Sequence, residues 1–253
     1  MIRFDNVVKL LGGQAVLDGL TFEVQQGETF VIVGPSGVGK SVTLKHMVRL
    51  LTPDAGRVYV GDDCVSEATG GALERIRERF GYLFQGGALL GWLSMAENVA
   101  LPLREKTNLD EGEIRRRIAA TLRLVGLEEH ADKSPDELSG GMRKRAGLAR
   151  AIIRNPEIVL YDEPTSGLDP VTSRTIDTLI ERLRRELGVT SVVVTHDLHS
   201  ALSIGTRIAM LHAGKIIALC TPQEFVQSSN EEVRAFLDSQ YITKRGDWER
   251  TAQ

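Results

Sequence analysis

The segment Gly34-Pro35-Ser36-Gly37-Val38-Gly39-Lys40-Ser41 fits the pattern G-x-x-x-x-G-K-[ST], between an apolar stretch at 30–33 and an amphipathic helical pattern. Glycines allow such a loop to fold closely around phosphates, and its backbone N–H groups and the helix N-terminus attract negative charge. Lys40 is then placed to reach the terminal phosphates and Ser41 to bind Mg²⁺, and Thr43 is a further candidate binding residue. A glycine-rich turn without a ligand is the alternative. Because the strand and the helix stand where the mechanism needs them, the segment predicts a nucleotide-binding phosphate loop.

Two carboxylates, Asp162 and Glu163, directly follow an apolar strand pattern at 158–161. An acidic group fixed by a strand beside a phosphate loop is the arrangement that holds Mg²⁺ in nucleotide hydrolases. Asp162 is therefore the candidate metal ligand, and Glu163 is the candidate general base that orients and polarises the attacking water. An acidic pair at a strand end also occurs as a solvated turn or a helix N-cap. The phosphate loop in the same chain favours the hydrolytic role.

Short apolar runs rich in β-branched residues are followed by turns and helical patterns. They fit strands buried on both faces and predict an α/β fold with a mainly parallel sheet; they lie at 30–33, 158–161 and 192–194. Stretches of alternating polarity predict a small antiparallel layer at the edge of the sheet; these lie at 2–8, 20–24 and 57–60. Between about 88 and 155 the pattern becomes helical, which predicts a helical subdomain inserted into a mixed-sheet core.

The strand pattern 189–195 follows a helical pattern that ends near Gly188, so the core resumes after the insertion. We expect one domain over 1–220. The remaining residues, 221–253, are polar with one helical segment near 233–237. We expect this extension to be disordered or ordered only against a partner.

Composition excludes several classes of protein. The 253 residues are 42% hydrophobic and 26% charged, unlike a disordered, fibrous or disulfide-stapled chain. With 31 Lys and Arg against 34 Asp and Glu the net charge is -3, so we expect no nucleic-acid partner. Cys64 and Cys220 lack metal-site spacing and are expected to be reduced thiols. The apolar runs are far shorter than the ~18 residues of a membrane span, and the amino terminus lacks a signal-peptide core, so we expect a cytosolic location.

A third motif, Leu138-Ser139-Gly140-Gly141-Met142, opens a helical pattern and is a second candidate anion-binding helix N-terminus. Alone it is usually only a helix cap. Together with the phosphate loop and the acidic pair, it resembles the signature motif of ATP-binding cassette (ABC) ATPases. Gln85 after the strand pattern 80–84 resembles the Q-loop glutamine, Ser166-Gly167-Leu168-Asp169 resembles the D-loop, and His196 resembles the switch histidine. The resemblance covers about residues 1–220 and implies a P-loop NTPase of ABC type.

In that family two ATPase domains face each other head to tail, with each ATP between one phosphate loop and the other protomer's signature. The resemblance therefore implies a homodimer that hydrolyses ATP with Mg²⁺. It assigns Ser139-Gly140-Gly141 to the γ-phosphate across the interface, Gln85 to Mg²⁺ and the attacking water, and His196 to the γ-phosphate. Asp169 of the D-loop joins the binding residues. For His196 the alternatives are a structural role or a metal pair with His199, although no third ligand is evident.

Two positions depart from the family pattern. Met142 replaces the usual glutamine at the end of the signature, which we expect to be tolerated. Leu11 stands where many cassettes carry an aromatic residue that stacks on adenine. Because base–aromatic stacking is worth about 1–3 kcal/mol, we expect modest ATP affinity and weak discrimination against GTP.

Two stretches resemble one subgroup of the family: Phe84-Gln85-Gly86-Gly87-Ala88-Leu89-Leu90 and Glu97-Asn98-Val99-Ala100-Leu101-Pro102-Leu103-Arg104-Glu105. They are similar to the Mla-type phospholipid-trafficking ATPases, related to toluene-tolerance and Mce lipid-import systems, as are the tail residues 233–238. Those homodimers bind an MlaE-like permease, a STAS-domain protein and an Mce-domain protein. The resemblance implies phospholipid trafficking between inner and outer membrane, and a peripheral position on the cytoplasmic face of the inner membrane. It also implies that the extension 221–253 contacts the partner protomer.

Apolar side chains beside Gln85 are candidates for contact with a permease helix, namely Ala88, Leu89, Leu90 and Trp92. The alternative is that they belong to the core of the helical subdomain. Two other functions stay open: a soluble ABC ATPase that acts on nucleic acid or ribosomes, and a transporter ATPase with a different substrate. Soluble members usually carry two cassettes or a long coiled-coil insertion, and neither pattern is present in this sequence.

Overall fold

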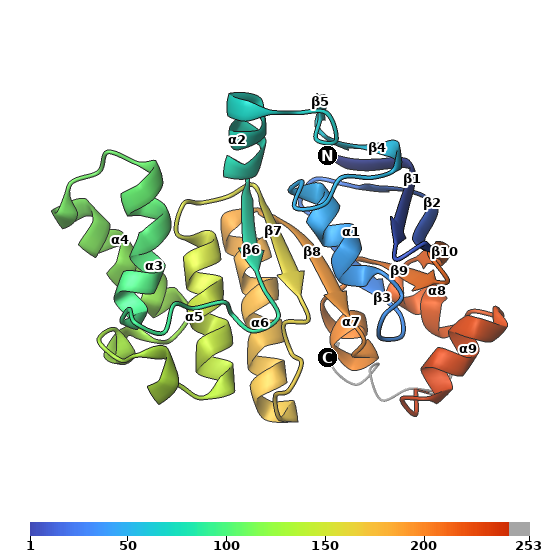
Figure 1. Ribbon diagram of the computed structural model, residues 1–253. Helices are drawn as coiled ribbons and strands as arrows, with labels where there is room; N and C mark the ends of the chain where they lie inside the picture. Colours follow the sequence, from blue (N-terminus) through green and yellow to red (C-terminus); the bar gives the residue numbers. More distant parts are fainter. Residues whose placement is uncertain (243–253) are drawn as a thin grey trace.

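Two β-sheets and the helices around them make up residues 1–242, the part of the chain that the computed structural model describes (Figure 1). The strands are β1 (Ile2–Leu11), β2 (Gln14–Val24), β3 (Thr29–Val33), β4 (Ala55–Val60), β5 (Asp63–Cys64), β6 (Phe80–Leu83), β7 (Ile158–Asp162), β8 (Thr190–Thr195), β9 (Arg207–His212) and β10 (Lys215–Cys220). The α-helices are α1 (Lys40–Met47), α2 (Gly70–Glu78), α3 (Met95–Lys106), α4 (Glu111–Leu124), α5 (Gly140–Ile152), α6 (Pro170–Leu187), α7 (Leu198–Ile204), α8 (Pro222–Val226) and α9 (Glu231–Asp238).

The larger sheet has the strand order β10-β9-β3-β8-β7-β6. All neighbours in it are parallel except β10, which runs antiparallel to β9. The register pairs Val33 with Thr195 and Leu83 with Tyr161, so neighbouring strands end at the same edge. The prediction of an α/β fold with a mainly parallel sheet is confirmed. Strands β9 and β10 complete the sheet and were not located in the sequence.

The smaller sheet is antiparallel, with the order β2-β1-β4-β5, and confirms the predicted edge layer. Phe22 of β2 lies between two other aromatic rings. Its ring centroid is 4.5 Å from that of Phe4 and 5.2 Å from that of Phe30 on β3, and both pairs are stacked. The stack joins the two sheets next to the helix that follows the phosphate loop.

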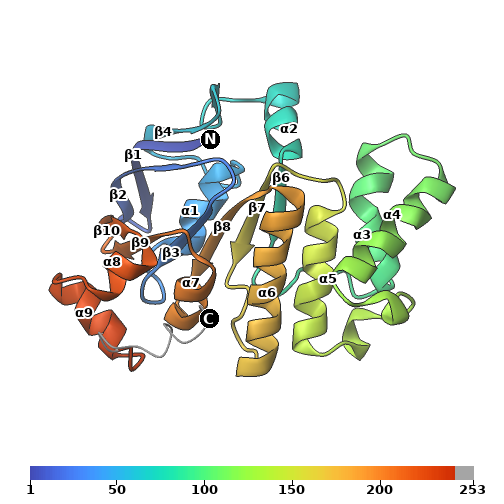
Figure 2. The ribbon, with the colours of Figure 1, turned by 180° about the vertical axis from the view of Figure 1, so that it is seen from behind.

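Alternate residues of the parallel strands face opposite sides of the larger sheet, as the two-residue period of a strand requires. Val31 and Val33 pack with α5, α6 and α7, whereas Phe30 and Ile32 pack with α1 and the smaller sheet. Figures 1 and 2 show α5 and α6 on one face of the sheet and α1 on the other. Each fully buried aliphatic side chain contributes roughly 1.5–3 kcal/mol of transfer free energy. The sheet is therefore a rigid support for the loops at its edge.

Three helices, α3, α4 and α5, stand between β6 and β7, so the predicted helical insertion is confirmed as part of the fold. Helix α4 buries Ile114, Ile118 and Leu122, the positions that recur at helical spacing in the sequence. Helix α3 begins with a capping box in which Ser94 and Glu97 satisfy each other's backbone N–H groups. Viewed in Figure 1, α3 and α4 lie beyond α5 at the side of the molecule.

The segment after β10 packs on the core of its own chain. Phe225, Val226, Val233 and Leu237 are fully buried in the same cluster as α5 and α6. For residues 221–242, the expectation of disorder or of order only against a partner is therefore wrong. The prediction relied on the many polar residues of this segment and overlooked its apolar stripe. Val233 and Leu237, four residues apart, lie on one face of α9.

Neither cysteine is in a disulfide. Within residues 1–242 no helix has the length and apolar character needed to cross a membrane.

Candidate functional site

Four predicted motifs meet at one edge of the larger sheet because four neighbouring parallel strands end there. The phosphate loop follows β3, His196 follows β8, Glu163 follows β7, and Gln85 comes two residues after β6. In open α/β sheets, ligands bind at the carboxyl ends of the strands. The strand order β3-β8-β7-β6 thus assembles residues that are up to 162 positions apart in the sequence, from Gly34 to His196.

The phosphate loop runs from Gly34 into the first turn of α1. Gly39 has a φ of +106°, and a Cβ there would lie 2.9 Å from the Val16 carbonyl oxygen, so a side chain would be strained and crowded. Lys40 Nζ donates to the carbonyl oxygens of Gly34 at 2.8 Å and Pro35 at 3.0 Å. Burial lowers the pKa of Lys40, and the nearby Glu163 carboxylate opposes this shift. The loop therefore holds a buried cation at its centre.

The predicted metal ligands lie side by side. Ser41 Oγ donates to Asp162 Oδ1 at 2.7 Å, and Asp162 is buried. Tyr82 Oη, from β6, donates to the other carboxylate oxygen at 3.4 Å. Burial and the Asp162 charge raise the pKa of Tyr82. By contrast, Thr43 is fully buried, and its hydroxyl donates to the Gly39 carbonyl, so it supports the loop from inside α1.

Glu163 has a backbone φ of +50°, a left-handed conformation that costs a non-glycine residue about 1–3 kcal/mol. Contacts from three sides hold it there. Its N–H donates to the Val194 carbonyl of β8 at 2.9 Å, and its own carbonyl accepts from Lys144 Nζ at 2.7 Å. Its carboxylate lies 2.8 Å from His196 Nδ1 and 3.5 Å from Lys40 Nζ. The candidate base is thus fixed in backbone and side chain.

Lys144 was not among the residues predicted from the sequence. It is buried on α5, and burial lowers its pKa. The sequence carries a signal for it, because Lys144 shares the apolar face of α5 with Gly141, Leu148 and Ile152 at helical spacing. A lysine on a buried helix face needs a polar partner, which here is the Glu163 carbonyl.

Within residues 1–242, no hydrogen bond joins the side chains of Gln85 or Ser139 to the phosphate loop or to the acidic pair. Gln85 is exposed, and no hydrogen bond from its side chain to the other site residues occurs within residues 1–242. Ser139 is exposed as the N-cap of α5, where its hydroxyl accepts from Met142 N–H at 3.3 Å. Gly141 is buried where a Cβ would overlap the side chain of Thr172 on α6. At Gly140, between them, a Cβ would lie 3.3 Å from the Leu168 side chain.

Asp169, the last D-loop residue, caps α6. Its carboxylate accepts from the N–H groups of Val171 and Thr172, both at 3.0 Å, and from the Thr172 hydroxyl at 2.5 Å. These hydrogen bonds lower the pKa of Asp169, and the one from the Thr172 hydroxyl has the largest effect. The carboxylate is occupied within its own helix, as a capping residue would be.

The two departures from the family pattern have different surroundings. The side chain of Met142 packs against the main core cluster, so an apolar residue fits there. Leu11 lies at the end of β1, paired with Gln14, and is 43% exposed.

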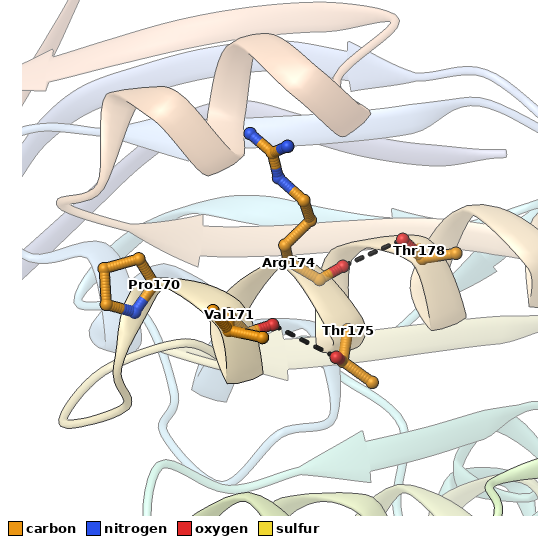
Figure 3. Close-up of a pocket in the computed structure, with 5 residues that line it drawn as sticks. All are labelled: Pro170, Val171, Arg174, Thr175 and Thr178. Atoms are coloured by element: carbon orange, nitrogen blue, oxygen red, sulfur yellow. Dashed lines mark hydrogen bonds between the residues drawn. The ribbon is translucent and has the colours of Figure 1, made fainter.

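Two surface hollows lie near the D-loop. The larger, of about 370 Å³, runs along one side of α6 and is lined by Pro170, Val171, Arg174, Thr175 and Thr178. Figure 3 shows the hydroxyls of Thr175 and Thr178 turned back to carbonyls of their own helix, at 3.1 and 2.8 Å. The smaller, of about 270 Å³, is lined by 165–168, Ser173, His196, Asp197 and Gln240. Only this second hollow borders the predicted site.

Several known proteins are similar to this chain in sequence. A model of the ABC transporter family matches residues 17–166. The probable ribonucleotide transport ATP-binding protein mkl of Mycobacterium leprae is 40% identical over 242 residues, which are 95% of this chain and 70% of that protein. The intermembrane phospholipid transport system ATP-binding protein MlaF of Haemophilus influenzae is 38% identical over 237 residues, 94% of this chain and 90% of that protein.

A solved structure of an ATP-binding cassette has a similar fold. The dimeric post-hydrolysis state of the ATP-binding cassette MJ0796, bound to ADP and Pi, superposes with a TM-score of 0.81 at 35% identity. The match covers 88% of this chain and 99% of that cassette. With the phosphate loop, the acidic pair and the signature helix in place, the chain belongs to the ABC transporter family and is an ATP-binding subunit that hydrolyses ATP.

Proposed function

We propose that two copies of the chain close head to tail around two ATP molecules and that hydrolysis drives a lipid permease in the membrane. The observation that carries the hydrolytic part is the Glu163 carboxylate, held between His196 Nδ1 at 2.8 Å and Lys40 Nζ at 3.5 Å. A carboxylate next to the phosphate-binding lysine is positioned to take a proton from water that attacks the terminal phosphate. Nδ1 of His196 faces Glu163, which leaves Nε2 for the γ-phosphate, and an imidazolium ring would donate to both groups.

Mg²⁺ fits the oxygen atoms beside the phosphate loop. The Ser41 hydroxyl and the buried Asp162 carboxylate lie 2.7 Å apart, and Mg²⁺ prefers oxygen ligands of this kind together with phosphate oxygens. We propose that three residues hold the ion: Ser41, Asp162 and Gln85. Gln85 comes two residues after β6, the strand next to β7. When bound, Mg²⁺ supplies charge neutralisation at the phosphates.

The signature residues act across the dimer in this proposal. Ser139 stands exposed at the N-terminus of a 13-residue helix, where N–H groups and the helix dipole favour an anion. Ser139, Gly140 and Gly141 of one protomer would contact the γ-phosphate that lies in the partner's phosphate loop.

The surface beside Gln85 is where we propose that the permease binds. Trp92 is 80% exposed, and Leu89 and Leu90 are half-buried. Leu89 packs against the core cluster, so it belongs in part to the helical subdomain, as the alternative interpretation holds. Asn98 is fully buried and fixes this segment through two hydrogen bonds to Leu90. Its Oδ1 accepts from the Leu90 N–H, and its Nδ2 donates to the Leu90 carbonyl. An exposed tryptophan on such a fixed segment suits contact with an apolar helix.

Phospholipid is the substrate class that we propose. Support comes from the MlaF relative, which this chain matches over 90% of its length, and from the resemblance of segments 84–90 and 97–105. On this proposal the partners are an MlaE-like permease, a STAS-domain protein and an Mce-domain protein. The chain then lies peripherally on the cytoplasmic face of the inner membrane.

Affinity purification from native membranes in mild detergent, with mass spectrometry of proteins and lipids, tests the proposal. Recovery of an MlaE-like permease with phospholipid is the expected result. A different permease would keep the ATPase role but discard the lipid assignment. Recovery of ribosomes or nucleic acid instead of a membrane protein would favour the soluble alternative. Trp92→Ser is the matched variant, since it should reduce permease recovery without a change in ATP binding.

The C-terminal extension, 221–253, is proposed to contact the partner protomer. Because residues 221–242 contribute to the core of their own chain, a deletion that tests this contact must begin after Ile242. The last part of this extension, 243–253, lies outside the described residues. A chain that ends at Ile242 should keep its fold and form a weaker dimer in sedimentation. An unchanged monomer–dimer equilibrium would contradict the proposed contact.

A further inference from the structure

The side-chain amide of Gln240 binds both sides of the turn that carries His196. Its Nε2 donates to the His196 carbonyl oxygen at 2.7 Å, and its Oε1 accepts from the Leu198 N–H at 2.8 Å. The two contacts lie on either side of Asp197 and span 44 and 42 positions of sequence. The segment after α9 thus contacts the backbone of a residue at the ATP site.

Gln240 is itself held in place by the end of α9. The N–H of Ile242 donates to the Leu237 carbonyl, and the N–H of Tyr241 donates to the Asp238 carbonyl, both at 3.1 Å. This pattern closes the helix end with Tyr241 in the left-handed region, at a φ of +58°, while Leu237 and Ile242 are buried. The backbone strain at Tyr241 is therefore tied to the burial of Ile242, and Gln240 is carried on an anchored turn.

The other side of the His196 turn is also fixed, but by residues of the α/β core. Asp197 caps α7 through the N–H groups of His199 and Ser200, at 2.9 and 3.2 Å. The Ser200 hydroxyl donates to the buried carboxylate of Asp177 on α6 at 2.5 Å. The His196 side chain reaches Glu163 at 2.8 Å. Within residues 1–242, these contacts and those of Gln240 link the turn to three different parts of the chain.

We propose that Gln240 is a positioning residue for His196, which makes the geometry of the ATP site depend on how the C-terminal helix α9 is docked. The amide acts on the backbone on both sides of Asp197, so its loss frees the turn and lets the imidazole move relative to Glu163. Gln240 and His196 also border the same 270 Å³ hollow beside the D-loop. A partner that displaces α9 would therefore change hydrolysis without contact with ATP. This inference rests on the proposed role of His196 at the γ-phosphate.

Gln240→Leu in the full-length chain tests the inference, because leucine keeps the size of the side chain but makes neither hydrogen bond. We expect kcat for ATP to fall about tenfold while KM stays within about twofold, since a misplaced group affects the transition state more than ground-state binding. Gln223→Leu is the matched control, because Gln223 is an exposed glutamine on α8 in the same C-terminal region. It should leave kcat unchanged. Gln240→Glu keeps the acceptor for Leu198 N–H but loses the donor to His196, and it provides a second variant should leucine impair folding.

The His196→Ala background separates positioning from a general structural effect. If Gln240 acts through His196, Gln240→Leu should lower kcat in the wild-type background and have no further effect on His196→Ala. An equal fall in both backgrounds, or a kcat equal to that of the Gln223→Leu control, would overturn the inference. If His196→Ala itself turns over ATP at the wild-type rate, the proposed role of His196 fails instead.

Discussion

The two helix N-termini that bear the ATP-binding motifs differ in what surrounds them. The phosphate loop at α1 is complete within its own chain, since Lys40 and Ser41 contact the carboxylates of Glu163 and Asp162. The signature at α5 is not. Ser139 is exposed, and within residues 1–242 none of its hydrogen bonds reaches the phosphate loop. One helix N-terminus is preorganised within its own chain, and the other begins at an exposed N-cap residue, Ser139.

On the proposed head-to-tail dimer, this difference accounts for the two candidate anion-binding helix N-termini of a single chain. Each is worth a favourable interaction with phosphate, but they do not converge on one ligand in the same copy. In the proposed dimer, each phosphate loop receives the signature of the other copy. Each composite site then has two halves, the phosphate loop of one copy and the signature of the other. Hydrolysis depends on both halves, whereas ATP binding depends mainly on the phosphate loop.

The largest expected effect comes from a change beside the phosphate loop, the half of the site that is complete within one chain. Glu163→Gln keeps the shape of the side chain but removes the proposed base, so hydrolysis should fall by about 10² to 10⁴-fold. ATP binding should persist, because Lys40 keeps its place through the Gly34 and Pro35 carbonyls. Steady-state ATPase assays and gel filtration with ATP measure both effects, and a dimer that stays locked with ATP is expected. Wild-type turnover in this variant would mean that another group is the base.

Pairing two inactive variants tests whether the halves meet across the dimer. Lys40→Ala should lose most ATP binding, and Ser139→Arg should bind ATP but not hydrolyse it. In a mixed dimer, the intact phosphate loop of the Ser139→Arg chain faces the intact signature of the Lys40→Ala chain, which restores one site. Mixing the two inactive proteins should therefore recover activity, up to about half of the wild-type value per mixed dimer. A mixture as inactive as its components would show that the halves act within one chain.

The sequence was sufficient to place the phosphate loop and the acidic pair side by side. The phosphate loop, Asp162 and Glu163 each follow an apolar strand, and parallel neighbours bring the strand ends together. It was insufficient for contacts between residues far apart in sequence, on which function depends in our proposal. Gln240 reaches back 44 positions to His196, and Lys144 reaches forward 19 positions to Glu163, without a motif that links either pair. Such contacts follow from the packing of α9 and α5, which periodicity places on a face but not against a given neighbour.

Lys144 sharpens the comparison because it links the two motifs within one chain. It lies on the signature helix α5 and donates to the carbonyl of Glu163, the proposed general base. Lys144→Met keeps the length of the buried side chain but removes the hydrogen bond to the Glu163 carbonyl. Glu163, in its strained conformation, is then less firmly held, and we expect kcat to fall about tenfold with KM for ATP nearly unchanged. Arg115→Met, which changes an exposed cation on α4, is the control and should not alter kcat. Equal kcat in the two variants would mean that the lysine serves only the packing of α5.

The smallest expected effect concerns Leu11, which by the family resemblance stands where many cassettes carry an aromatic residue that stacks on adenine. Leu11→Tyr restores a ring on an exposed hairpin, so the gain should lie at the low end of the roughly 1–3 kcal/mol of base stacking, or about fivefold tighter ATP binding. Leu10→Tyr is the matched control, since Leu10 is the adjacent position on β1, where successive side chains point to opposite faces, and is similarly exposed, 47% against 43%. Competition between ATP and GTP for the unmodified chain completes the test, with weak discrimination expected. A strong preference of the unmodified chain for ATP would show that other contacts recognise the base and that the loss of the aromatic residue at Leu11 has been compensated.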